Sequence, residues 1–198
     1  MPRLFTGIEI PEHIADRLAF LRGGLVGARW IDTANYHLTL RFIGDVDMDV
    51  AEEAADSLAR VRRPAFPLRF TGLGVLGTKK HHAVVAEVEP SRPLMELQAE
   101  HERILQRLGL QAEGRKYTPH VTLARLRSGN ARNIAEYLTL RGGFFAEPFV
   151  VDRFVLFSSR DSIGGGPYIV EQAYDLTVPR MPAPGIGTGE EHGRWPQN

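Results

Sequence analysis

Residues 36–42 read Tyr-His-Leu-Thr-Leu-Arg-Phe, and residues 119–125 read Pro-His-Val-Thr-Leu-Ala-Arg. A histidine and a threonine separated by one apolar residue therefore occur once in each half of the chain. Alternation of polar and apolar residues at a period of two is typical of a β-strand with one buried face. Each stretch is predicted to be a strand, and the internal repeat predicts two similar lobes that face each other.

Successive side chains of a strand point to opposite faces. His37 and Thr39 should therefore share one face while Leu38 points into a core, and His120 and Thr122 should repeat this arrangement. Each strand would present an imidazole and a hydroxyl while its apolar side anchors it, which is how a rigid site is built. We expect the two pairs to meet in a cleft between the lobes.

The rest of the chain alternates predicted strands and helices. The predicted strands cover residues 3–10, 36–43, 68–75, 83–88, 120–126, 150–158 and 168–178. The predicted helices cover residues 11–21, 50–61, 94–108 and 131–140, and most of them end near Gly or Pro. The sequence thus predicts an α+β fold with two pseudo-symmetric lobes, each an antiparallel β-sheet with outer helices.

A chain of 198 residues with 43% hydrophobic residues is long enough to bury a core. We predict one bilobal domain over residues 1–178 and a flexible Pro/Gly-rich tail over residues 179–198. Because 24 Lys and Arg balance 24 Asp and Glu, net charge gives no general attraction to nucleic acid, and phosphate contacts must come from a local site. The absence of cysteine excludes disulfides and thiol nucleophiles.

Residues 1–11 hold one Arg and no long apolar run, so we expect neither a signal peptide nor a membrane span there. The expected location is cytoplasmic. We expect no membrane partner and no obligate protein partner, and we expect a monomer.

With both motifs, the chain resembles the two-histidine (2H) phosphoesterases, and among them the bacterial and archaeal RNA 2′,3′-cyclic phosphodiesterases, also called 2′-5′ RNA ligases. The resemblance runs from Leu4 to about Leu176. Besides the motifs it includes residues 3–5, 30–44, 117–125, 154–159 and 166–168. At residues 80–86 the chain departs from its relatives, which usually carry a Pro-containing strand with a Trp there. The resemblance implies an enzyme that hydrolyses RNA 2′,3′-cyclic phosphate ends to 2′-phosphates.

The chemistry of the motif residues agrees with this. In-line hydrolysis of a cyclic phosphodiester needs one base and one acid on opposite sides of phosphorus, and histidine titrates near neutrality. The hydroxyls of Thr39 and Thr122 can donate to the non-bridging oxygens, and Arg125 adds positive charge, so no metal or other cofactor is needed. By resemblance, His37 matches the proton donor, His120 the proton acceptor and Arg125 a phosphate-contacting position.

Other residues allow two interpretations each. Phe42 lies at the same offset from its histidine as Arg125, and it would pack either against a base or in the core. Tyr117, with Arg115 and Lys116, would contact the substrate or belong to a surface loop. Residues 79–82 would form a basic rim that draws in RNA or a solvated hairpin turn.

Two further patterns are interpreted as structural. Gly164, Gly165 and Gly166 lack the strand-to-helix setting and the lysine of a nucleotide-binding loop, so we expect a hairpin loop near the mouth of the site. The acidic residues at 45, 47 and 49 alternate like calcium ligands, but no matching Gly and distal Glu follow. We interpret them as acidic residues at a helix start.

Alternative functions remain at this point. One is reversible 2′-5′ RNA joining, or phosphodiester hydrolysis on another 2′-linked or cyclic nucleotide. Another is a non-catalytic module that binds RNA ends. A metal-dependent hydrolase would need carboxylates at ligand spacing around the histidines, and neither motif supplies them. The expected partners are RNA with 2′,3′-cyclic phosphate ends or cyclic nucleotides.

Overall fold

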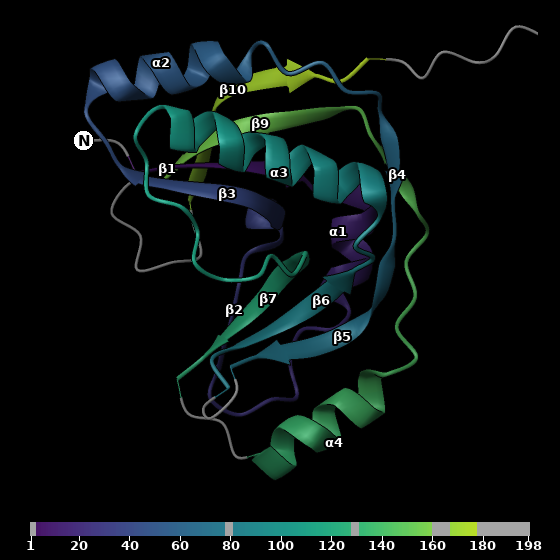
Figure 1. Ribbon diagram of the computed structural model, residues 1–198. Coiled ribbons are helices and arrows are strands. Elements are labelled where there is room, and N and C mark those ends of the chain that lie inside the picture. The colour runs from purple at the N-terminus through teal and green to yellow at the C-terminus, as the bar shows by residue number, and fades with distance from the viewer. Residues whose placement is uncertain (1–2, 78–80, 128–130, 160–166, 178–198) are drawn as a thin grey trace, which may run out of the picture.

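The computed structural model describes residues 3–77, 81–127, 131–159 and 167–177, which form ten strands and four α-helices (Figure 1). The strands are β1 (Arg3–Glu9), β2 (Ala28–Trp30), β3 (His37–Asp45), β4 (Phe66–Leu68), β5 (Phe70–Leu76), β6 (Ala83–Val88), β7 (His120–Leu126), β8 (Phe149–Val151), β9 (Arg153–Ser159) and β10 (Tyr168–Asp175). The helices are α1 (Glu12–Ala19), α2 (Met48–Leu58), α3 (Arg92–Arg107) and α4 (Ala131–Arg141), with a 3-10 turn η1 (Thr33–Asn35) before β3. Among the described residues, no helix is both long and apolar enough to cross a membrane.

The predicted elements are largely confirmed, and they differ from the structure where a strand changes partners. The predicted strand over residues 68–75 is confirmed from Phe70 onward as β5, which pairs with β6, whereas Leu68 belongs to β4, which pairs with β8. The predicted strand over residues 150–158 divides in the same way at Asp152, between β8 and β9. The short strand β2, which pairs with the end of β7, was not predicted.

Eight strands build one antiparallel sheet in the order β10-β9-β1-β3-β7-β6-β5, with β2 added to β7, and β4 and β8 form a separate two-stranded sheet. Its two halves meet where β3 and β7 are joined through the pair Leu38–Val121. In Figure 1 the two strands begin close together and then diverge, with β1, β9 and β10 beside β3 and with β5 and β6 beside β7. The α+β class with two antiparallel lobes is therefore confirmed, and the lobes are joined edge to edge at this pair.

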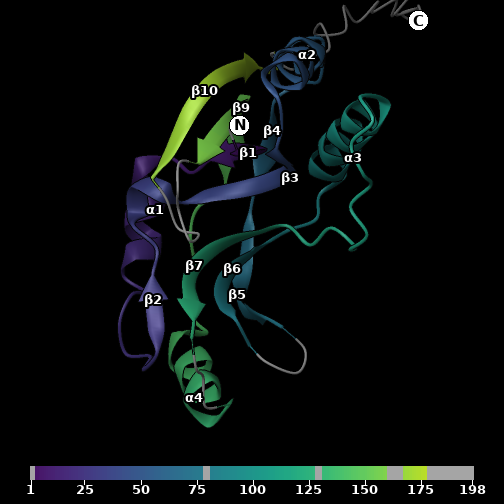
Figure 2. The ribbon, with the colours of Figure 1, turned by 90° about the vertical axis from the view of Figure 1, so that its left-hand side faces the viewer.

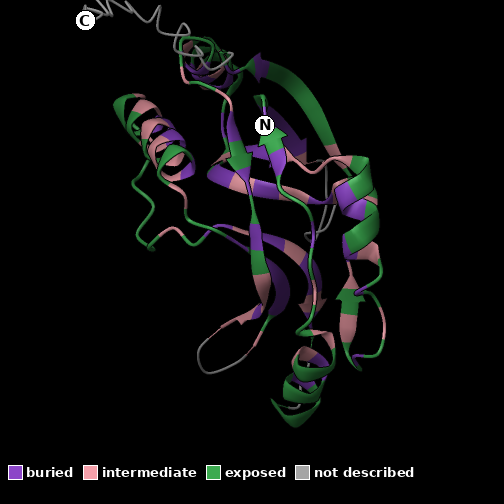
Figure 3. Ribbon diagram, turned by 90° about the vertical axis from the view of Figure 1, so that its right-hand side faces the viewer, coloured by how far each residue is buried: buried purple, intermediate pink, exposed green. Residues whose placement is uncertain are grey.

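Helix α3 links the two halves. It follows β6 in the chain but packs against β3 and α2 of the other half. Its buried Leu94, Leu97 and Leu105 lie at helical spacing, and Figure 3 shows exposed residues on its outer side. The helix ends where Gly109 adopts a φ of +82° and the Leu110 N–H donates to the Leu105 carbonyl at 3.1 Å.

The apolar core is continuous beneath both motifs. Leu38 and Val121 are completely buried and belong to the same cluster of core side chains. β1 approaches this junction closely at Gly7, where an added Cβ would lie 2.9 Å from the Leu38 carbonyl oxygen and 3.2 Å from the Phe157 ring. The two motif strands are therefore positioned by core packing.

Candidate active site

The strand β3 presents its functional residues as the sequence predicts. His37 and Thr39 are partly exposed, whereas Leu38 and Leu40 are buried. On β7, His120 and Thr122 are likewise partly exposed while their apolar neighbours are buried. The alternation expected for both motifs is confirmed.

A bulge then changes the face of the following residues on β3. Thr39 pairs with Gly7 of β1, but the next paired residue is Arg41, so Leu40 has no counterpart on β1. Leu40 and Arg41 are both buried, and Phe42 returns to the face of the motif residues. The Phe42 side chain is 53% exposed and its ring centroid lies 5.6 Å from that of Phe5, so the interpretation as a core aromatic is wrong.

The same bulge occurs on β7. Thr122 pairs with Val85 of β6 and Ala124 with Val84, which leaves Leu123 without a counterpart on β6. Leu123 and Ala124 are both buried, and Arg125 is partly exposed. Arg125 therefore reaches the face of the motif residues by the same backbone device as Phe42, and each lies five positions after its histidine.

The junction of the two strands brings the motifs together. Because Leu38 lies opposite Val121 in an antiparallel pair, extending the register by one residue puts His37 beside Thr122 and Thr39 beside His120. Figure 2 shows β3 and β7 running in opposite directions at this point. Both imidazoles and both hydroxyls therefore lie on one face of the junction.

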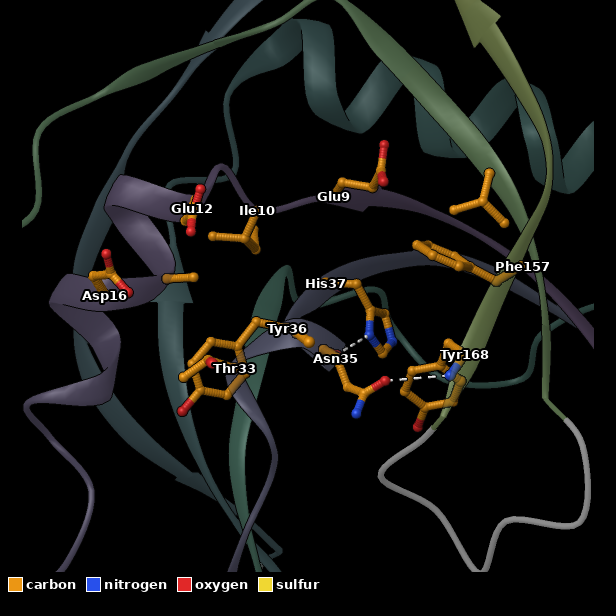
Figure 4. Close-up of a pocket in the computed structure, with 13 residues that line it drawn as sticks. Glu9, Ile10, Glu12, Asp16, Thr33, Asn35, Tyr36, His37, Phe157 and Tyr168 are labelled. Atoms are coloured by element: carbon orange, nitrogen blue, oxygen red, sulfur yellow. Dashed lines mark hydrogen bonds between the residues drawn. The ribbon is translucent and has the colours of Figure 1, made fainter.

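The two rings are oriented by matching hydrogen bonds. His37 Nδ1 lies 2.8 Å from the Asn35 carbonyl oxygen, as Figure 4 shows, and His120 Nδ1 lies 2.6 Å from the Thr118 carbonyl oxygen. A carbonyl only accepts, so Nδ1 of each ring carries the proton. In the neutral rings Nε2 therefore keeps a lone pair, and it is the atom available for proton transfer.

Aromatic rings surround His37. Ring centroids lie 4.9 Å away for Phe5, 4.8 Å for Tyr168 and 5.5 Å for Phe157. The Asn35 side chain accepts a hydrogen bond from the Tyr168 backbone N–H at 3.2 Å, so one residue orients the imidazole and also fixes the start of β10 (Figure 4). Asn35 was not predicted as a site residue, and its position two residues before the motif histidine is the only signal of its role in the sequence.

Burial lowers the pKa of His37 to about 4, and the positive charges of His120 and Arg125 contribute in the same direction. Burial also lowers the pKa of His120, again with a contribution from Arg125. Both rings are therefore neutral near pH 7 in the free protein. A bound anion would offset the charge of Arg125 and raise both pKa values.

Tyr117 lies three residues before β7 and is bonded to β3. Its hydroxyl donates to the Thr39 carbonyl at 2.9 Å, and burial raises the pKa of the phenol. Because the hydroxyl is engaged with backbone, the ring face is what Tyr117 can offer a ligand. Arg115 and Lys116 are exposed and line the same cavity, of about 630 Å³, together with His120.

A buried ion pair holds the loop that carries these residues. The Arg41 guanidinium pairs with Glu102 of α3 and also donates to the Gln111 carbonyl. Glu102 accepts a further hydrogen bond from the Glu113 backbone N–H at 3.0 Å. The loop between α3 and β7 is thus tied to β3 beneath the site. Sequence reasoning assigned no role to Arg41, because the bulge that buries it is a tertiary feature.

Some of the remaining predicted residues lie outside the described part of the chain. His82 lines the cleft, whereas Lys79, Lys80, the glycine run 164–166 and the predicted tail 179–198 lie outside the described residues. Asp47 is the N-cap residue of α2 and Asp49 lies in its first turn, as expected for helix-start acidity, whereas Asp45 is the last residue of β3, so that interpretation is wrong for Asp45. Within the described ranges, no group of three or more His, Asp or Glu side chains is arranged to hold a metal ion.

The fold and site define a two-lobed phosphoesterase type in which paired histidines meet at a strand junction. Residues 10–162 match the 2'-5' RNA ligase superfamily, and the chain belongs to this family. It is 35% identical over 130 residues to an RNA 2',3'-cyclic phosphodiesterase of Aeropyrum pernix, covering 63% of this chain and 73% of that one. It is 31% identical over 134 residues to the Bacillus subtilis protein of the same name, covering 65% and 73%.

A crystal structure of a Thermus thermophilus protein has a similar fold. The TM-score is 0.74 at 21% identity, with 89% of this chain and 99% of that chain covered. At this identity the likeness concerns the fold alone, and it agrees with the α+β architecture described above.

Proposed function

We propose that this protein is an RNA 2′,3′-cyclic phosphodiesterase that opens the cyclic phosphate to leave a 2′-phosphate end. The observation that carries the proposal is the pair of Nε2 atoms that His37 and His120 present on one face, each set by an Nδ1 bond to a backbone carbonyl. The names of the Aeropyrum and Bacillus relatives support the same reaction.

In the proposed reaction, water attacks phosphorus as the bond to the ribose 3′-oxygen breaks. His120 Nε2 takes the proton from water, and His37 Nε2 gives a proton to the departing 3′-oxygen. The ring that accepted a proton ends charged and the ring that donated ends neutral, so charge balances. The resemblance to the family supplies these two roles.

The depressed pKa of His37 bears directly on the donor role. A ring with a pKa of about 4 is neutral near pH 7 and cannot give a proton. The substrate phosphodiester carries a negative charge, which would favour the charged imidazole beside it. We therefore propose that substrate binding itself loads the donor with a proton.

The other motif residues stabilise charge on the phosphate. The hydroxyls of Thr39 and Thr122 donate to the non-bridging oxygens, and Arg125 neutralises the charge that develops there. Phe42 offers an exposed ring on the same face, on which a base can stack, and Tyr117 offers its ring face in a cavity that Phe42 also lines.

A product assay in chelator tests the proposal. Purified protein is incubated with an oligonucleotide that ends in a 2′,3′-cyclic phosphate, and the product isomer is identified by chromatography or ³¹P spectroscopy. We expect a 2′-phosphate, and we expect His37→Ala and His120→Ala each to slow turnover about 100- to 10,000-fold.

Other products would select an alternative function. A 3′-phosphate would contradict the proposed bond cleavage, and joining to an added 5′-hydroxyl RNA would favour reversible 2′-5′ ligation. Tight binding without turnover would favour a module that binds RNA ends. The monomeric state and the cytoplasmic location expected from the sequence belong to the same proposal, and sedimentation of the purified protein would check the first.

A further inference from the structure

A cavity of about 600 Å³ opens beside the catalytic face and is lined by four arginines, Arg3, Arg29, Arg125 and Arg127. We infer that it binds the phosphodiesters upstream of the cyclic end, so that the preferred substrate is an oligonucleotide rather than a nucleoside cyclic phosphate. The inference rests on the proposed function and adds to it the class of substrate.

The arginines are placed by strand geometry. Arg29 of β2 lies directly opposite Arg125 of β7, and residues opposite each other in an antiparallel pair project from the same face. Figure 2 shows β2 and β7 side by side. Arg127 follows β7, where its N–H donates to the Gly27 carbonyl at 3.2 Å. Residues two positions apart on an extended chain are about 7 Å apart, which suits successive phosphates of a single strand.

The cavity is continuous with the catalytic centre. Arg125 belongs to both, and its charge acts on His37 and on His120. Phe42 lines this cavity and also the neighbouring one that reaches His120. A strand whose terminal phosphate sits between the histidines can therefore continue along the arginines without leaving the surface.

The charge of the surrounding cavities favours this direction. The described lining of the arginine cavity includes no carboxylate. The cavity on the other side of His37, drawn in Figure 4, is lined by Glu12 and Asp16, which would repel a phosphate backbone, and by Glu9, which is paired with Arg153. An RNA strand that leaves the catalytic centre is therefore drawn toward the arginines and away from the acidic side.

The test compares substrates of increasing length that share one 3′-terminal base. These are adenosine 2′,3′-cyclic phosphate and the corresponding di- and triadenylates, assayed with wild type, Arg29→Gln and Arg127→Gln. We expect wild-type kcat/KM to rise about tenfold from the mononucleotide to the trinucleotide. Each variant should lower the ratio of the trinucleotide kcat/KM to the mononucleotide kcat/KM several-fold. Each should also reduce the slope of log kcat/KM against log salt by about 0.7, as for one lost phosphate contact.

Two controls accompany these variants. Arg132→Gln removes a similar charge from α4, where the side chain is 84% exposed and pairs with Glu136, and it should leave the ratio unchanged. The double variant Arg115→Gln/Lys116→Gln tests the alternative path over the other cavity.

Three results would overturn the inference. The first is equal wild-type kcat/KM for all three substrates. The second is an equal loss on every substrate in the Arg29 and Arg127 variants. The third is a kcat/KM that no longer rises with substrate length in the Arg115/Lys116 double variant but still rises in the Arg29 and Arg127 variants. A wild-type protein that hydrolyses none of the three would overturn the proposed function and this inference with it.

Discussion

Leu38 of β3 lies directly opposite Val121 of β7, and the two halves of the sheet are joined through this pair. Both side chains are completely buried in one core cluster, and each directly follows a motif histidine. The separation of the two imidazoles is therefore set by a hydrophobic contact on the opposite face of the strands. Such packing positions polar side chains through their apolar neighbours, so the polar groups are not needed to hold the two strands together.

Activity should survive an excess of EDTA. In the proposed mechanism, two imidazoles, two hydroxyls and the Arg125 guanidinium supply acid, base and charge stabilisation, so no Lewis acid is required. Initial rates with and without EDTA, on protein first dialysed against chelator, check this. Loss of turnover that a divalent ion restores would refute the mechanism.

The pH dependence should differ between kcat/KM and kcat. Burial holds the pKa of His37 at about 4 and that of His120 below its usual range, so kcat/KM, which reports the free protein, should already be falling as pH rises through 6.5. The falling limb of kcat should lie at higher pH, because the bound phosphodiester favours a charged ring. Both limbs belong to the coupled pair. A kcat/KM that stays level up to pH 9 would contradict this account.

Replacing Thr39 or Thr122 by Val should lower turnover while the fold is kept. Valine preserves the β-branched shape that suits a strand and deletes only the hydroxyl donor. We expect each variant to lose about 10-fold or more in kcat/KM, and the double variant to depart from additivity because both hydroxyls hold one phosphate. Measurements of kcat and KM for the two single variants and the double variant test this, with thermal melts as the control for folding. Full activity in both single variants would make these threonines ordinary strand residues.

Phe42→Ala should weaken substrate binding more than folding. The side chain is 53% exposed, so little core packing is lost, whereas a stacked base contributes about 1–3 kcal/mol. We expect KM for a cyclic-phosphate oligonucleotide to rise about 10-fold with an unchanged melting temperature. Phe145→Ala is the matched control, since that ring is 73% exposed outside the site cavities described above. An unchanged KM in the Phe42 variant would remove the ring from the binding surface.

His101 should make the protein sensitive to acid. It is fully buried in α3, with Nδ1 2.9 Å from Thr6 Oγ1, and burial lowers its pKa to about 3 from an ordinary 6.5. Protonation therefore favours the unfolded chain. The stability that the neutral ring supports is present above pH 6.5 and is lost as pH falls toward 3, at up to about 1.4 kcal/mol per pH unit.

Urea melts between pH 4 and 8 measure this slope. His101→Phe keeps a ring against Phe154, whose centroid is 4.5 Å away, and removes the titrating group. Its free energy of unfolding should change less between pH 6.5 and 4 than that of the wild type. Equal slopes would show that other groups carry the acid sensitivity, His37 among them.

The local features of this protein could be predicted from its sequence because each depends on neighbours in the chain. The alternation in residues 37–40 identifies a strand and the face on which His37 and Thr39 lie. The helical spacing of apolar residues identifies α3, and Gly109 marks its end, where a positive φ is needed. Repetition of one motif in both halves was enough to predict two lobes and a paired site.

Tertiary structure decided what depends on pairing between distant strands. The bulges that return Phe42 and Arg125 to the face of the motif residues were not predicted, because each is defined only by the register with β1 or β6. The junction at Leu38 and Val121 and the burial of Arg41 beneath it arise in the same way. Side-chain period is a property of one strand, whereas register belongs to two. The sequence alone therefore determined which polar groups share a face of each strand, and packing between strands determined where the two sets meet.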